Sequence, residues 1–223
     1  MREISCVFLD VVGTILQPHS PVNETYYHFG NKHGSSKSTD FIKSAFESAF
    51  VLEELKDAKN AYKTDEFRES ERWRNIVAAC FPDLKNPDLC FKDLFEHYAK
   101  PNSWSIPLGV STLLDHLDCN LIPWGIASNF DFRLKDIIEK KAEFNRCKWQ
   151  VISSVVGYKK PSHLFFQHLL TASGFPANKI LMVGDNFEND ITPAEQLGMR
   201  AFQVKERLGS INSFEGLIQL LGK

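Results

Sequence analysis

The sequence has no long hydrophobic run and no excess of one charge. Its one early apolar stretch, residues 4–9, ends at Asp10, so it is too short to cross a membrane and breaks off where a signal peptide would continue. The formal net charge is −2 over 223 residues, with both signs scattered along the chain, which leaves no basic stripe to neutralise a nucleic-acid backbone. We therefore expect a cytoplasmic protein that binds neither membranes nor nucleic acids.

Cysteine is also scarce. The five cysteines are odd in number and widely spaced, and no CxxC pair suggests a zinc or redox site. We expect reduced, mostly buried thiols. The apolar fraction of 43% is ordinary for a globular protein, and the chain is long enough for one α/β core with an inserted module.

The two ends of the chain carry the signature of alternating strands and helices. Residues 4–9 form a β-rich run without clean alternation, which is typical of a strand buried on both faces of a parallel sheet. Further strands are predicted near residues 121–127, 149–153 and 180–183, with amphipathic helices between them. This order predicts a Rossmann-like α/β fold, a doubly wound parallel sheet with right-handed crossovers.

The middle of the chain reads as helices only. Apolar residues recur there at helical spacing, and the stripes predict helices that pack on one another. The stripes are Ile42, Ala45, Phe46 and Ala49; Trp73, Ile76, Val77 and Cys80; and Phe91, Leu94, Phe95 and Tyr98. We therefore assign residues 1–16 and 105–223 to the α/β core and residues 17–104 to an inserted all-helical module.

Polar side chains follow the predicted strands where each strand ends. Asp10 follows the first strand, Ser128-Asn129 the second, Lys160 the third and Asp185 the fourth. Ligands of open α/β sheets bind beyond the carboxyl ends of the strands. A carboxylate that attacks, a second that helps to hold Mg²⁺, and a hydroxyl and an ammonium that balance phosphate charge would suit phosphoryl transfer.

The same residues form four motifs in order along the chain. They are Asp10-Val11-Val12-Gly13-Thr14, the strand-ending Ser128, Lys160-Pro161, and the Gly-Asp-Asn-Phe-Glu-Asn-Asp run at residues 184–190. Over essentially the whole chain this pattern resembles the haloacid dehalogenase (HAD) superfamily of hydrolases. Within this superfamily, the residues around Ser128 and Asp185 are most similar to those of the group that contains haloacid dehalogenase-like hydrolase domain-containing protein 3.

The resemblance implies a role for each motif residue. Asp10 would be the nucleophile, and the helical insert would be the small cap that closes over substrate. The metal would be Mg²⁺, held by Asp10, Asp185 and the backbone carbonyl of Val12. Ser128, Asn129 and Lys160 would bind phosphate, and Gly13, Thr14 and Asp190 would support the site. We expect the neighbouring Lys159 to be an ordinary solvated surface charge.

Val12 departs from the pattern of the phosphatases. Their second aspartate protonates the leaving oxygen and then activates water, a contribution of about 10² to 10⁴ in rate, and valine can do neither. We expect a Mg²⁺-dependent phosphatase with weakened acid/base catalysis, acting through an aspartyl-phosphate on a small phosphorylated metabolite. Two alternatives remain: a 2-haloacid dehalogenase, which needs no acid here but would not need the Gly184-Asp185 pair, and a binding or scaffold protein that has lost turnover.

Overall fold

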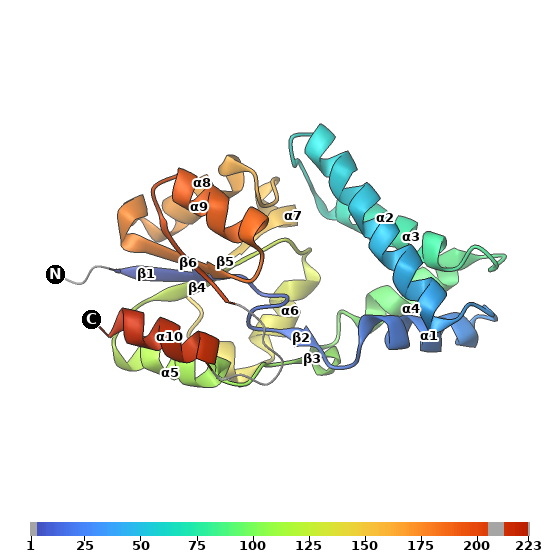
Figure 1. Cartoon of the computed structure of the whole chain (residues 1–223), viewed down its shortest axis with the longest axis horizontal. Coiled ribbons are helices and arrows are strands. Elements are labelled where there is room, and N and C mark those ends of the chain that lie inside the picture. Colours follow the sequence, from blue (N-terminus) through green and yellow to red (C-terminus); the bar gives the residue numbers. More distant parts are fainter. Residues whose placement is uncertain (1–3, 205–211, 223) are drawn as a thin grey trace.

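The computed structural model describes residues 4–204 and 212–222, so the remaining residues of the predicted core, 1–3, 205–211 and 223, lie outside the described residues. Its core is a parallel sheet with the strand order β5-β4-β1-β6-β7, covered by helices on both faces (Figure 1). The strands are β1 (Cys6–Leu9), β4 (Trp124–Ser128), β5 (Trp149–Ile152), β6 (Ile180–Gly184) and β7 (Arg200–Gln203). This confirms the predicted α/β Rossmann-like fold.

The central strand β1 shows why the sheet is buried on both sides. Every residue of β1 is buried, and the strand pairs in parallel with β4 and with β6. Val7 and Leu9 point to one apolar cluster, whereas Cys6 and Phe8 point to another on the opposite face. Because successive side chains of a strand face opposite sides, a strand with two buried faces must be apolar throughout.

The helices of the core complete these two clusters. The first face is covered by α5 (Val110–Cys119), α6 (Arg133–Glu139) and α10 (Asn212–Leu221), and the second by α8 (His163–Ser173) and α9 (Thr192–Gln196) (Figure 1). The short helix α7 (Ser153–Val156) follows β5 directly. The remaining short elements are the 3-10 turns η1 (Pro101–Ser103), η2 (Ala142–Phe144) and η3 (Ala177–Lys179), and the π-helical turn η4 (Phe187–Ile191).

The observed core differs from the predicted one in three respects. β4 begins at Trp124 rather than at Leu121, because Leu121 has a left-handed backbone (φ 54°) and an 85% exposed side chain, which places it in a turn. The sequence analysis also did not predict β7 or α10. β7 is an edge strand of four residues without a fully buried face, so it lacks the continuous apolar run by which the other strands were found.

The inserted helices form a separate body with its own apolar core. They are α1 (Val22–Lys32), α2 (Thr39–Lys59), α3 (Glu66–Cys80) and α4 (Pro87–His97). Ser38 and Asp65 cap the N-termini of α2 and α3 by accepting hydrogen bonds from Phe41 N and Arg68 N. Pro87 begins α4 at a position where its missing N–H costs no hydrogen bond.

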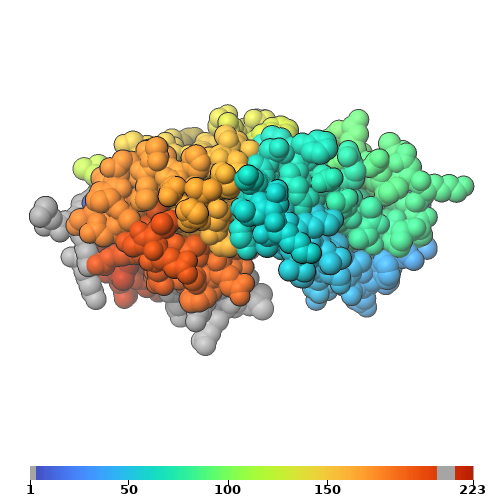
Figure 2. Space-filling view, turned by 90° about the horizontal axis from the view of Figure 1, so that it is seen from above, coloured from blue at the N-terminus to red at the C-terminus, as the bar shows by residue number. Residues whose placement is uncertain are grey.

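Several connections fix this helical body against the core, and two of them are a strand ribbon and a hydrogen-bonded contact of α3. The first is a short antiparallel ribbon of β2 (Gln17–Pro18) and β3 (Trp104–Ser105), in which the predicted boundaries of the insert lie. The second joins the start of α3 to the core, where the Glu66 carboxylate accepts hydrogen bonds from the Ser154 hydroxyl and from Phe132 N. Figure 2 shows the two bodies side by side and touching, with the cyan part of the helical body against the yellow-orange part of the core.

All five cysteines are free. Cys6, Cys80 and Cys90 are buried, Cys147 is half-buried and only Cys119 is exposed, in agreement with the predicted reduced and mostly buried thiols. Among the helices of the described ranges, none combines the length and the apolarity needed to span a bilayer.

The close packing of β4, which carries Ser128, makes its glycine a test of the core. A Cβ added at Gly125 would lie 2.6 Å from the Trp149 carbonyl oxygen and 3.0 Å from the Phe8 ring. We expect Gly125→Ala to lower the free energy of unfolding by about 1–3 kcal/mol, because neither neighbour can move without displacing a strand. Urea denaturation followed by circular dichroism measures this change.

Gly216→Ala on α10 is the matched control. A Cβ there would have its nearest contact at 3.9 Å, on the Phe202 ring, and alanine favours a helix. The control should keep or raise stability; an equal loss in both variants would contradict the packing explanation.

Candidate active site

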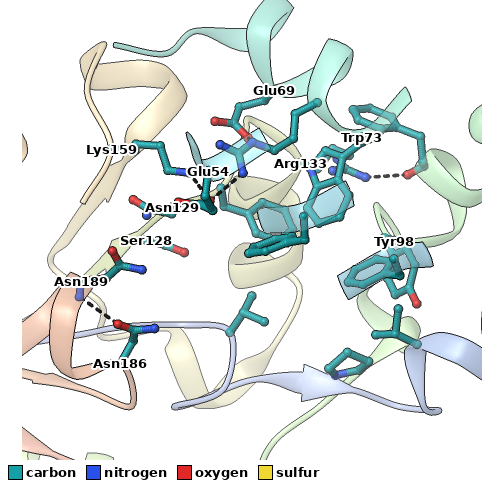
Figure 3. Close-up of a pocket in the computed structure, with 18 of the residues that line it drawn as sticks. Glu54, Glu69, Trp73, Tyr98, Ser128, Asn129, Arg133, Lys159, Asn186 and Asn189 are labelled. Atoms are coloured by element: carbon teal, nitrogen blue, oxygen red, sulfur yellow. Dashed lines mark hydrogen bonds and ion pairs between the residues drawn. The ribbon is translucent and has the colours of Figure 1, made fainter. Parts of the chain in front are cut away.

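The strand ends bring the predicted residues to one cavity between the core and the helical body. Asp10 follows β1, Ser128 ends β4, Lys160 lies in the loop between α7 and α8, and Asp185 follows β6. All four line a cavity of about 350 Å³ whose opposite wall comes from α2, α3 and α4. Figure 3 shows Ser128 and Asn129 on the core side of this cavity.

Lys160 is the centre of the site. Its side chain is fully buried, and its ammonium donates to Asp10 Oδ1 at 2.6 Å, to Asp190 Oδ1 at 2.5 Å and to the Ala127 carbonyl oxygen at 2.9 Å. An ammonium has three donors, so all of them are satisfied. Burial alone would lower the pKa of Lys160, but the two carboxylates outweigh it and raise the pKa above the usual value. Lys160 is therefore a fixed positive charge.

The carboxylates of Asp10 and Asp185 lie close together, and both are near the Thr14 hydroxyl. The Thr14 hydroxyl lies 3.0 Å from Asp10 Oδ2 and 3.4 Å from Asp185 Oδ1, so it can donate to either carboxylate. Burial and the nearby Asp10 charge raise the pKa of Asp185 above its ordinary value. A cation between the two carboxylates would relieve this cost.

Gly13 allows this close approach. Its φ of +94° is the left-handed conformation that glycine adopts readily, and a Cβ at this position would lie 2.5 Å from Asp185 Oδ2. Gly13, predicted to support the site, therefore leaves room for the second carboxylate.

Asp190, predicted to support the site, accepts a hydrogen bond from the Lys160 ammonium and so can orient it. Its Oδ1 accepts from the Lys160 ammonium and its Oδ2 accepts from Asn186 N at 3.1 Å. Burial raises the pKa of Asp190 to about 6, against the lowering effect of Lys160. The π-helical turn η4 carries the residue, and the Asn186 side chain caps this turn by accepting from Glu188 N and Asn189 N.

Asn129 is tied to the Lys160 backbone. Its side chain donates to the Lys160 carbonyl oxygen at 2.9 Å and accepts from Lys160 N at 2.7 Å. The side chain therefore holds the Lys160 loop against the end of β4. Within the described residues the Ser128 hydroxyl has no hydrogen-bond partner, so it remains available to a ligand.

The donor set of the site fits a hard divalent cation. Asp10, Asp185 and Asp190 each offer a carboxylate oxygen, and these oxygens lie within 4.8 Å of one another. Three carboxylates against the single ammonium of Lys160 leave two negative charges, which match one Mg²⁺. Asp190 has both of its carboxylate oxygens engaged, Oδ1 by Lys160 and Oδ2 by Asn186 N, whereas Asp10 Oδ2 and Asp185 Oδ1 share the single Thr14 hydroxyl. Asp10 and Asp185 are therefore the carboxylates better placed to serve as ligands.

Val12 occupies the position of the missing acid. Its side chain is 39% exposed and lines the cavity beside Asp10 and Asp185. Coordination by its carbonyl stays a prediction. The exposed side chain faces the space that a substrate would enter, and it carries no proton to donate there.

The expectation for Lys159 is wrong. Its side chain is buried, and its ammonium lies 2.6 Å from Glu54 Oε1 and 3.1 Å from Asp57 Oδ2, both on α2. Arg72 on α3 pairs with the same two carboxylates. Burial and then the Arg72 charge lower the pKa of Lys159 to about 8. The sequence could not show this, because only the folded chain brings α2 and α3 over the Lys159 loop.

Comparison with known proteins identifies the family of the chain. The family model described as haloacid dehalogenase-like hydrolase matches residues 4–198. The chain belongs to this family of hydrolases. Among curated relatives, haloacid dehalogenase-like hydrolase domain-containing protein 3 of Danio rerio is 24% identical over 208 residues, which cover 91% of this chain and 86% of that protein.

Solved structures of HAD hydrolases share the fold. A HAD phosphatase from Thermococcus onnurineus superposes with a TM-score of 0.69 at 19% identity, covering 98% of both chains. An L-2-haloacid dehalogenase from Xanthobacter autotrophicus superposes with a TM-score of 0.70 at 14% identity, covering 90% of this chain and 77% of that one. The fold therefore accommodates both chemistries, and the choice between them depends on the side chains.

The contact between Gly13 and Asp185 yields a test of the metal site. In Gly13→Ala the new Cβ and the Asp185 carboxylate cannot occupy their present positions together, so we expect Mg²⁺ affinity to fall by about tenfold or more. Isothermal titration calorimetry with MgCl₂ measures this change.

Gly34→Ala is the matched control. Gly34 has nearly the same backbone conformation (φ +91°), but a Cβ there would meet nothing within 4 Å. This variant carries the backbone strain alone and should bind Mg²⁺ like the parent. Equal Mg²⁺ affinity in the two alanine variants would show that Asp185 holds no metal.

Proposed function

We propose that this HAD hydrolase is a Mg²⁺-dependent phosphatase that acts through an aspartyl-phosphate on Asp10, with a small phosphorylated metabolite as its substrate. The observation that carries the proposal is the charge balance of the site: three carboxylates surround one ammonium at the base of a cavity. Such a site attracts a divalent cation, and the cation in turn makes the cavity favourable for a phosphate dianion.

Asp10 is held ready to attack phosphorus. Lys160 fixes Asp10 Oδ1, and Thr14 lies within hydrogen-bonding distance of Oδ2. Bound Mg²⁺ would lower the repulsion between this carboxylate and the phosphate. The P–O bond to the leaving group breaks as the bond to Asp10 forms; water then releases inorganic phosphate and regenerates the carboxylate.

The other residues would hold the transferring group. The Ser128 hydroxyl lines the cavity and has no hydrogen-bond partner in the part of the chain that the structure describes, which supports a role in phosphate binding. Lys160 has placed all three of its donors on protein acceptors, so it would offset phosphate charge at short range rather than reorient to bind it.

Val12 favours one second candidate, a 2-haloacid dehalogenase. A halide departs without a proton, so a side chain that cannot donate one is no handicap in that reaction. Asp185 argues against it, because a second carboxylate beside Asp10 would repel the carboxylate of a haloacid unless a metal were bound.

A substrate panel separates these functions. With Mg²⁺ we expect release of phosphate from p-nitrophenyl phosphate and acetyl phosphate, measured by malachite green, and no activity after chelation with EDTA or in Asp10→Asn. Release of chloride from 2-chloropropionate without metal would instead establish a dehalogenase. A folded protein inert on every phosphate and on the haloacid would be a binding or scaffold protein.

Restoring the acid tests the role of Val12. We expect Val12→Asp to raise turnover most for substrates with poor leaving groups, such as sugar phosphates, by up to about 10², because the new carboxyl can protonate the departing oxygen. The measurement is kcat against the pKa of the leaving group, whose slope should flatten in the variant. Val12→Asn, which has the same shape without the acid, is the control, and thermal melting checks that both variants fold.

A further inference from the structure

The cavity above Asp10 continues far beyond the space that a phosphate needs. Its floor is polar. The helical body lines the other side with aromatic rings, Phe46, Phe50, Trp73, Phe95 and Tyr98, beside the charged Glu54, Glu69 and Arg72. Figure 3 shows Ser128 and Asn129 on one side of the pocket and Trp73 and Tyr98 on the other. A ligand anchored on the floor must therefore place its remaining atoms against this wall.

The aromatic wall is preformed by contacts among its own rings. Phe50 stacks on Phe46 at 6.1 Å between ring centroids, and both rings lie 6.5 Å from the Trp73 ring. Aromatic rings in such offset arrangements give a large, rigid apolar surface that loses little entropy when a flat ligand binds.

The cations around this wall are already neutralised. Arg133 forms a forked pair with Asp131, at 2.7 Å from Nε to Oδ1 and 2.6 Å from Nη2 to Oδ2, and its guanidinium lies 3.5 Å from the centroid of the Phe95 ring. Arg72 and Lys159 both lie on Glu54, at 2.7 and 2.6 Å. A second phosphate or carboxylate would have to compete with these carboxylates, so the far end of the substrate is better matched by an uncharged group.

Val12 independently restricts the leaving group of the substrate, which is the part that would lie against the aromatic wall. Without a general acid, the leaving oxygen must depart as an anion. A phenol ionises at about pH 10, as tyrosine does, whereas an alcohol is close to water, with a pKa of about 15.7. A phenolate therefore leaves far more readily than an alkoxide.

We propose that the substrate is an aryl phosphate, a phosphate monoester whose leaving group is a flat phenolic ring packed against Phe46, Phe50 and Trp73. The inference rests on the proposed phosphatase function and narrows its substrate class. Asp10 attacks phosphorus, the P–O bond breaks with both electrons on the aryl oxygen, and that oxygen takes a proton from water. Water then cleaves the aspartyl-phosphate, so the products are a phenol and inorganic phosphate.

The first experiment measures turnover. 2-Naphthyl phosphate and phenyl phosphate have leaving groups of nearly equal acidity, so their ratio of kcat/KM reports contact with the wall. We expect the naphthyl ester to be favoured about tenfold through its extra buried ring, and glycerol 3-phosphate to be much slower than either. Equal rates on glycerol 3-phosphate and phenyl phosphate would overturn the inference while leaving a phosphatase; no turnover on any phosphate would overturn both proposals.

A matched pair of variants locates the effect. Phe50 and Phe41 lie on the same helix, α2, with 37% and 41% of each residue exposed, but only Phe50 lines the cavity. We expect Phe50→Ala to lose about five- to tenfold in kcat/KM for 2-naphthyl phosphate and Phe41→Ala to stay within about twofold of the parent. Equal losses in both variants would overturn the assignment of this wall, and Phe50→Leu, with melting curves, separates loss of the ring from loss of folding.

A binding measurement is independent of catalysis. Benzylphosphonate and methylphosphonate carry the same charge and contain no ester bond to hydrolyse, so their affinities differ only through the ring. Calorimetry in Mg²⁺ should give about tenfold tighter binding of benzylphosphonate, and this preference should disappear in Phe50→Ala. Equal affinities in the parent protein would overturn the inference whether or not the protein is a phosphatase.

Discussion

The site depends on one buried positive charge. Lys160 lies in the interior with all three of its N–H donors on oxygen, and its acceptors come from three separate strand ends: Asp10 after β1, Ala127 in β4 and Asp190 after β6. A buried ammonium without such partners would cost several kcal/mol, so the strand ends must meet at this point. The parallel sheet supplies the meeting place, because the carboxyl ends of all its strands lie along one edge.

This arrangement leaves more negative than positive charge in the site, because three carboxylates surround one ammonium. One ammonium satisfies Asp190 and part of Asp10, while Asp185 faces Asp10 across Thr14 with a raised pKa. The fold must supply the energy that holds the two carboxylates close together. Gly13 makes their approach possible, because a Cβ at that position would collide with the Asp185 carboxylate. A divalent cation bound between the two carboxylates would offset this repulsion, so the metal affinity that we propose would come from the same charges that oppose each other in the metal-free protein.

The sequence predicted the strand ends because their signal is local. Strands β1, β4, β5 and β6 are short apolar runs, and a polar residue that follows such a run can be placed at a sheet edge without knowing the rest of the fold. Contacts between distant segments gave no such signal. Lys159 was taken for a surface charge because its partners, Glu54 and Asp57, are on a helix about a hundred residues earlier in the chain. The Ala127 carbonyl was missed for a different reason: every residue has one, so no residue type marks it.

The helical body and the core constrain the substrate in complementary ways. The core loop has Val12, which cannot donate a proton, at the position of the general acid, so the leaving group must be one that departs readily as an anion. The helices above it place aromatic rings and neutralised cations along the path of that group, and this restricts it by shape and polarity. The two restrictions arise from different segments, the loop after β1 and the helices α2 and α3, so neither is a structural consequence of the other. If Val12 only filled space, any set of residues could line the opposite wall of the cavity. If Val12 restricts the enzyme to leaving groups that depart without a proton, the opposite wall must be able to bind such a group.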